Sequence, residues 1–109
     1  MNNASAPLAA PALAARLSAL GHPARIRILQ HLANAECCCC KDVVDCLDLA
    51  QSTVSQHLKV LVEAGLVAME PSGQRSNYRV DRAALSSLAG SVGVLLQSCC
   101  APAPSKPDR

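Results

Sequence analysis

Apolar side chains recur at helical spacing through the first third of the chain. Residues 8–20 predict a first helix, loosened by Pro11, and Gly21 suits its C-terminal end. Pro23 suits the first turn of a second helix that runs through residue 35. The stripe that we expect this second helix to bury consists of Ile26, Leu29 and Ala33, broadened by Ile28 and Leu32.

The middle of the chain predicts two further helices after a run of four cysteines. Residues 41–49 suit about two helical turns, and a short break at 49–51 separates them from a helix over 52–65. Gly65 suits the C-terminal end of that helix. The apolar positions that these two helices are expected to bury are Val43, Val44, Leu47, Val54, Leu58 and Leu61.

The segment that follows has the residue pattern of extended strands, and the segment after it is again helical in pattern. Residues 66–81 predict a β-hairpin, because Pro71-Ser72-Gly73 has the chemistry of a turn between two extended segments. Asp81 suits the N-cap of a last helix that Pro102 ends. The apolar face expected of that helix consists of Leu85, Leu88, Val92, Leu95, Leu96 and Cys99.

This order of elements predicts a winged helix-turn-helix: four helices, two strands and a fifth helix, mostly α with one small β-hairpin. We assign residues 8–100 to this single domain. Residues 1–7 and 101–109 are rich in proline and polar side chains and are expected to be flexible tails.

Composition narrows the class of protein. The chain of 109 residues is short for one domain, so association with a second copy would help its stability. Its apolar side chains are almost all Ala, Leu and Val, which favours helices, and Tyr78 is its one aromatic residue. We expect no stretch that reaches the ~20 apolar residues needed to cross a bilayer. The N-terminus also lacks the basic start of a signal peptide, so we expect a cytoplasmic protein without a membrane partner.

The seven cysteines carry the candidate chemistry, and the net charge of +2 adds little to it. Their number is odd and the cytoplasm keeps thiols reduced, which disfavours a disulfide framework. The run Cys37–Cys40 and the pair Cys99-Cys100 are candidate ligands for a soft, thiophilic ion. Consecutive residues of a helix fan out by ~100° each, so the whole run cannot face one ion on a helix. Cys46 is assigned a packing role.

Three stretches resemble the ArsR/SmtB family of metalloregulatory repressors. "LGHPARIRILQHL" looks like the family's second helix, "LAQSTVSQHLKVLVEAGLV" like its recognition helix with the following turn, and "SGQRSNYRV" like its wing. The resemblance runs from Ala19 to Val80. It implies a homodimer, paired through its first and last helices, that represses transcription by binding double-stranded operator DNA and is not an enzyme.

The expected DNA contacts come from the recognition helix and the wing. Short polar side chains and amides read base edges in the major groove, while lysine and arginine meet phosphates. The polar face opposite the buried stripe and the two hairpin arginines supply the expected contacts, which are Gln51, Ser52, Thr53, Ser55, Gln56, Lys59, Arg75 and Arg79.

The resemblance also implies an inducer. The family's arsenic and cadmium sensors often carry Cys-x-Cys where this chain has Cys39 and Lys41, and some arsenic-responsive members carry a vicinal C-terminal pair. We expect no permanently bound cofactor, and release from DNA by As(III), Sb(III) or a methylated arsenical. The candidate ligands are Cys37, Cys38, Cys39, Cys40, Cys99 and Cys100.

Other functions remain open beside this one. The same thiols suit Cd(II) or Pb(II). A redox or persulfide sensor of the same fold usually has a cysteine where this chain has Gln30. Zinc sensing is disfavoured because Asp81-Arg82-Ala83 lacks the family's Asp-x-His ligands. A thiol oxidoreductase would use Cys37-x-x-Cys40, but that motif lacks its usual βαβ context.

The three histidines are expected to be non-ligands. His57 lies on the recognition helix and is expected to be partly buried and hydrogen-bonded. His22 and His31 are expected at the surface.

Overall fold

The computed structural model describes residues 7–34 and 38–102. Its elements in chain order are α1 (Ala10–Leu20), α2 (Pro23–Ala33), β1 (Cys38–Cys39), α3 (Cys40–Cys46), α4 (Gln51–Glu63), β2 (Val67–Ser72), β3 (Arg75–Val80) and α5 (Arg82–Cys100). The predicted winged helix-turn-helix is confirmed, with β1 as an additional strand. Most of the two expected tails lies outside the described residues, so their flexibility stays a prediction.

The wing is a three-stranded antiparallel sheet in the order β1-β3-β2. Ser72 pairs with Arg75 across the hairpin, and Gly73 in the turn has a φ of 63°, a left-handed conformation that glycine adopts without strain. On the other edge of β3, Cys39 pairs with Asn77. The short strand β1 therefore joins the cysteine run directly to the wing.

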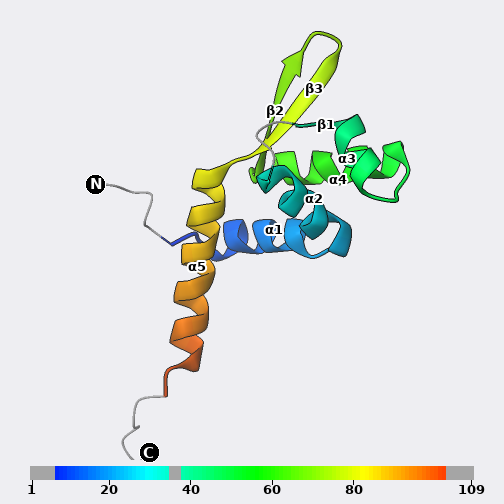
Figure 1. Cartoon of the computed structure of the whole chain (residues 1–109). Helices are drawn as coiled ribbons and strands as arrows, with labels where there is room; N and C mark the ends of the chain where they lie inside the picture. The colour runs from blue at the N-terminus through cyan, green and yellow to red at the C-terminus, as the bar shows by residue number, and fades with distance from the viewer. Residues whose placement is uncertain (1–6, 35–37, 103–109) are drawn as a thin grey trace, which may run out of the picture.

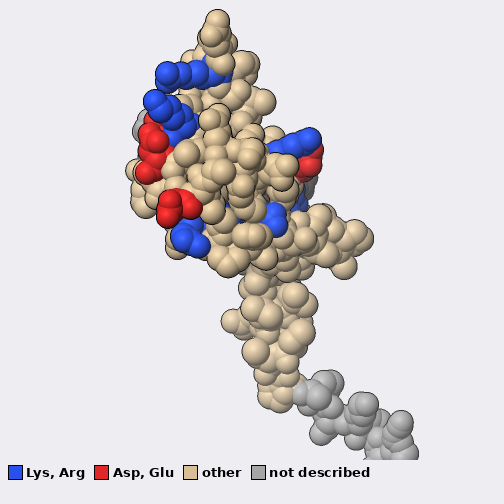
Figure 2. Space-filling view, turned by 90° about the vertical axis from the view of Figure 1, so that its right-hand side faces the viewer, with Lys and Arg blue, Asp and Glu red and all other residues tan. Residues whose placement is uncertain are grey.

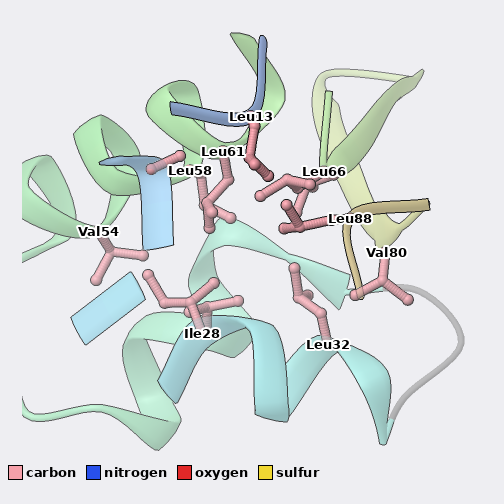
Figure 3. Packing of buried hydrophobic residues seen from close by; sticks show 12 residues of the cluster. Leu13, Ile28, Leu32, Val54, Leu58, Leu61, Leu66, Val80 and Leu88 are labelled. Atoms are coloured by element: carbon pink, nitrogen blue, oxygen red, sulfur yellow. The ribbon is translucent and has the colours of Figure 1, made fainter. Parts of the chain in front are cut away.

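One hydrophobic core holds α1 to α4 and the base of the wing together (Figure 3). Ile28 of α2 and Leu58 and Leu61 of α4 are fully buried in it. Leu13 and Leu88 bring α1 and α5 against the same cluster. The predicted burial on α3 and α4 is confirmed for Val43, Val54, Leu58 and Leu61, which are fully buried. Val44 and Leu47 are only half-buried against the core. Helices α1 to α4 and the three strands form the head of the molecule, residues 7–34 and 38–81.

The predicted stripe on α2 is confirmed at Ile28 and Leu32 and is wrong at Ile26 and Ala33. The buried residues of this helix are Ala24, Ile28 and Leu32, at i, i+4 and i+8, whereas Ile26 is 45% exposed and Ala33 is also exposed. The apolar residues of α2 cover a wide arc. Packing against α3, α4 and β3 selects which part of that arc is buried.

The end of α5 projects from the head as an arm, residues 94–100 (Figure 1). Every arm residue is exposed, and Leu96 is 54% exposed. Arg82 is the one charged residue of α5, so the arm carries no charge (Figure 2). By length and composition alone α5 is apolar enough to cross a membrane, with a mean hydropathy of 1.5, which corrects the expectation that no such stretch exists. The same surface suits burial against another chain.

Candidate nucleic-acid interface and thiol groove

Helix α4 turns a polar face to solvent. Its buried residues Val54, Leu58 and Leu61 fix which side of the helix faces the core. The N-cap residue is Ala50, whose methyl group accepts no hydrogen bond, so the N–H groups of the first turn gain no side-chain cap. The exposed residues of this face are those predicted: Gln51, Ser52, Thr53, Ser55, Gln56 and Lys59.

The two wing arginines lie in different electrostatic surroundings. Arg75 is exposed at the hairpin end of β3. Arg79 is also exposed, but its Nη1 atom lies 2.6 Å from Oε1 of Glu70 on β2. An exposed ion pair of this kind contributes little to stability. It does mean that a phosphate would compete with the Glu70 carboxylate for Arg79.

The cysteine run spans a strand and a helix instead of a single helix. Cys38 and Cys39 form β1, and Cys40 begins α3. Cys37 lies outside the described residues, as does the side chain of Cys38. The Cys39 side chain is buried, with 7% of its surface exposed, and Cys40 is half-buried. The spacing of the cysteines did not predict that the chain changes from strand to helix after Cys39.

Cys39 is the N-cap of α3 and is held by Asp42. Its backbone N–H donates to Oδ2 of Asp42 at 3.1 Å, and its thiol donates to the same oxygen at 3.3 Å. These two bonds, first from the backbone and then from the thiol, lower the pKa of the Asp42 carboxyl, with smaller help from Arg75 and His31. The Cys39 thiol therefore takes part in the hydrogen bonding that starts α3.

Cys40 follows Cys39 at the start of α3 and is half-buried. Burial raises the pKa of the Cys40 thiol, and the neighbouring Cys39 raises it further. Burial also raises the pKa of Tyr78 on β3, with a further contribution from Cys40. Both groups are therefore neutral near pH 7.

A groove of about 290 Å³ opens where α3, α4 and the wing meet. It brings the thiols into the same space as the start of the recognition helix and the cationic end of the wing. Its lining includes Cys39, Cys40, Lys41, Gln51, Arg75 and Ser76.

The remaining cysteines lie away from this groove. Cys46 is exposed at the end of α3, where the neighbouring Leu47 packs against the core in its place, so the packing role predicted for Cys46 is wrong. Cys99 and Cys100 are exposed at the end of the arm, at the opposite end of the molecule from β1 and α3 (Figure 1). Within the described parts of the chain, no group of three or more His, Cys, Asp or Glu side chains is placed to hold a metal ion.

Two histidines form a contact that the sequence did not predict. His57 is half-buried, as expected, and its ring centroid lies 4.5 Å from that of His22, with the rings tilted by 54°. His22 is exposed, as expected, but it is also the N-cap of α2. His31 is half-buried, which corrects its assignment to the surface.

Comparison with known proteins gives consistent results. A family model described as a helix-turn-helix domain matches residues 20–70. The HTH-type transcriptional repressor SmtB of Mycobacterium tuberculosis is 44% identical over 64 residues, which make up 59% of this chain and 47% of SmtB. The chain therefore spans about half the length of that relative.

Two solved structures extend the similarity over the fold. One is described as a possible transcriptional regulator for arsenical resistance; it is 30% identical with a TM-score of 0.66, covering 80% of this chain and 85% of that chain. The other, an ArsR-like transcriptional regulator from Rhodococcus sp. RHA1, has a TM-score of 0.73 at 25% identity, covering 82% and 83%. With its winged helix-turn-helix fold and these relatives, the chain belongs to the ArsR/SmtB family of transcriptional regulators.

Proposed function

We propose that this chain is a homodimeric transcriptional repressor that binds operator DNA through α4 and the wing and is released by a thiophilic metal(loid). As(III) or Sb(III) is the favoured inducer, and a methylated arsenical is a further candidate. The observation that carries this proposal is the shared groove, in which Cys39 and Cys40 lie beside Gln51 of α4 and Arg75 of the wing.

The DNA-binding part of the proposal rests on α4 and on the wing. Gln56 and Lys59 are exposed on the face of α4 opposite its buried stripe, and such a face suits the major groove. Arg75 is exposed near the hairpin tip and suits a phosphate or the adjacent minor groove.

The homodimer rests on α1 and α5. An apolar groove of about 530 Å³ between these helices is lined only by apolar residues and glycine. Leu17 lies in this groove and is 39% exposed, and Leu95 and Leu96 of the arm are 42% and 54% exposed. A second copy of the chain would cover this surface, and two-fold symmetry would present two α4 helices to two half-sites.

The inducer site is assigned to the cysteine run. Arsenous acid, As(OH)₃, is neutral and condenses with three thiols to give As(SR)₃ and three molecules of water. Cys39 and Cys40 supply two of these thiols, and Cys37 or Cys38 is the proposed third. Cys99 and Cys100 would reach these thiols only from a second chain, and as a pair they suit a methylated arsenical.

Ligation at Cys39 gives a direct route to the DNA-binding surface. An inducer that takes the Cys39 sulfur removes the thiol that donates to Asp42 at the start of α3. It also pulls on β1, which pairs with Asn77 of β3. The wing and the α3–α4 pair therefore differ between bound and free chains, and a coupling of about 1–3 kcal/mol suffices for release.

The thiol chemistry distinguishes the candidate inducers. Condensation of As(OH)₃ with neutral thiols releases water and no protons, so the raised pKa of Cys40 does not oppose it. Cd(II) or Pb(II) must displace the thiol protons, so their binding weakens as pH falls. The raised pKa also lowers the thiolate fraction of Cys40, which disfavours the redox or persulfide alternative at this residue.

Fluorescence anisotropy with the reduced protein and DNA fragments selected in vitro tests the DNA-binding role. We expect sequence-specific binding that weakens as salt rises, and that Gln56→Ala and Lys59→Ala each reduce. Gln30→Ala removes an exposed amide from α2 and serves as the matched control. Failure of the native chain to select any sequence would contradict the proposal.

A further inference from the structure

The contact between His22 and His57 joins two helices of the helix-turn-helix. His22 precedes α2 and its Nδ1 atom accepts a hydrogen bond from the backbone N–H of Ala24 at 3.1 Å. The same ring packs on His57, which follows Gln56 on α4. One imidazole therefore caps the start of α2 and supports the recognition helix at the turn that carries a proposed base contact.

The hydrogen bond defines the protonation state in which this arrangement is stable. A ring nitrogen that accepts a hydrogen bond carries no proton, so His22 is neutral here. In the imidazolium form both ring nitrogens are donors, and Nδ1 would then face the N–H of Ala24. Protonation of His22 therefore removes the N-cap of α2.

The charged neighbours of the pair are basic. Burial lowers the pKa of His57 first, and His22 and Arg25 lower it further. The Nε atom of Arg25 is buried and has no hydrogen-bond partner in the part of the chain that the structure describes. A second imidazolium therefore increases repulsion between α2 and α4.

We propose that His22 is a positioning residue for α4, and that protonation of the His22–His57 pair loosens the recognition helix and weakens DNA binding. This inference rests on the proposed DNA-binding role of α4.

The direction of the pH dependence follows from the thermodynamic linkage between proton binding and folding. A folded-state pKa of His57 below the usual value of about 6.5 means that the unfolded chain binds the proton more readily. The contribution of neutral His57 to stability is then complete above about 6.5 and is lost as pH falls through its folded-state pKa.

The substitution His22→Asn separates the cap from the titration. The asparagine side-chain oxygen is a good N-cap acceptor for the Ala24 N–H, but it carries no titrating group. The substitution His31→Gln removes a histidine outside the pair and serves as the matched control. Both variants are expected to fold, which circular dichroism checks.

An NMR titration of the imidazole nitrogens between about pH 5 and 8 tests the pair without DNA. We expect neutral His22 to carry its proton on Nε2. In His22→Asn we expect the pKa of His57 to rise towards its usual value, and to remain below it because burial and Arg25 persist. An unchanged pKa of His57 in this variant would overturn the inference.

Anisotropy of the DNA complex at about pH 5.5 and 7.5 then tests the consequence for binding. We expect the native affinity to fall on acidification, and His22→Asn to flatten this dependence. His31→Gln should keep the native dependence. Equal pH dependence in native and His22→Asn proteins would overturn the inference. A native chain that binds no DNA at either pH would instead contradict the proposed function, and the NMR titration would still decide the histidine coupling.

Discussion

The head and the arm each carry vicinal cysteines, in opposite surroundings. In the head, Cys39 is buried, caps α3 and pairs with β3, and Cys40 is half-buried beside it. In the arm, Cys99 and Cys100 are exposed at the end of an apolar helix. A ligand at the head thiols would change hydrogen bonds that hold the fold. A ligand at the arm thiols would act on the rest of the molecule only through a second chain.

The largest expected effect comes from the core of the head, which the exposed arm does not share. Leu58→Ala removes a fully buried side chain of α4, so we expect the free energy of unfolding to fall by about 2–5 kcal/mol. Ser55→Ala, on the exposed side of the same helix, should change it by less than about 0.5 kcal/mol. Urea denaturation at one fixed protein concentration measures both. Similar losses in the two variants would mean that α4 does not bury the face assigned to it.

The arm is expected to matter for association. Leu96→Glu places a charge on a side chain that is 54% exposed in one chain, so the head should still fold. We expect dimerisation to weaken by about 2 kcal/mol or more, roughly 30-fold in the dissociation constant. Sedimentation equilibrium measures this, with Ser98→Glu as the control that adds the same charge beside it. A fully dimeric Leu96→Glu protein would contradict the role given to the arm.

The capping bonds of Cys39 give a smaller effect with a defined pH dependence. Asp42→Asn weakens the acceptor for the Cys39 N–H and thiol, so we expect a modest fall in thermal stability. Because the pKa of Asp42 is lowered in the folded chain, its contribution is present above the usual carboxyl pKa of about 3.9 and is lost as pH falls through the folded-state pKa. Calorimetry from neutral to acidic pH measures this contribution. An identical pH profile in native and Asp42→Asn proteins would contradict it.

The smallest expected effect concerns the wing. Glu70→Gln frees Arg79 from its ion pair, so we expect DNA affinity to rise by about two- to fivefold, the range of an exposed pair. Glu63→Gln removes the same charge from the end of α4 and should raise affinity less. Binding isotherms at two salt concentrations measure both changes. A larger rise in Glu63→Gln would indicate a general charge effect instead of release of Arg79.

The parts of the fold that sequence predicted are those in which one face is clearly apolar. Val54, Leu58 and Leu61 lie opposite an entirely polar face, so the buried side of α4 followed from spacing alone. On α2, Ile26 and Ile28 point in different directions, and only packing selects Ile28.

The parts of the candidate site that sequence missed depend on contacts between distant segments. Strand β1 exists because Cys38 and Cys39 pair with Tyr78 and Asn77. The His22–His57 contact likewise joins two helices. Cys46 was assigned to packing from its residue type and its place in the family pattern, and the end of α3 leaves it exposed. The polar residues of α4 and the thiols at Cys39 and Cys40 were identifiable from sequence, but not their common groove.

Titration of As(III) into the DNA complex tests the central claim most directly. Three proteins are compared: the native chain, Cys39→Ser/Cys40→Ser and Cys99→Ser/Cys100→Ser. We predict that As(III) releases the native chain and the arm variant from DNA, and that the head variant binds DNA but is not released. Release of the head variant at the native As(III) concentration would contradict the assignment of the inducer to the head thiols.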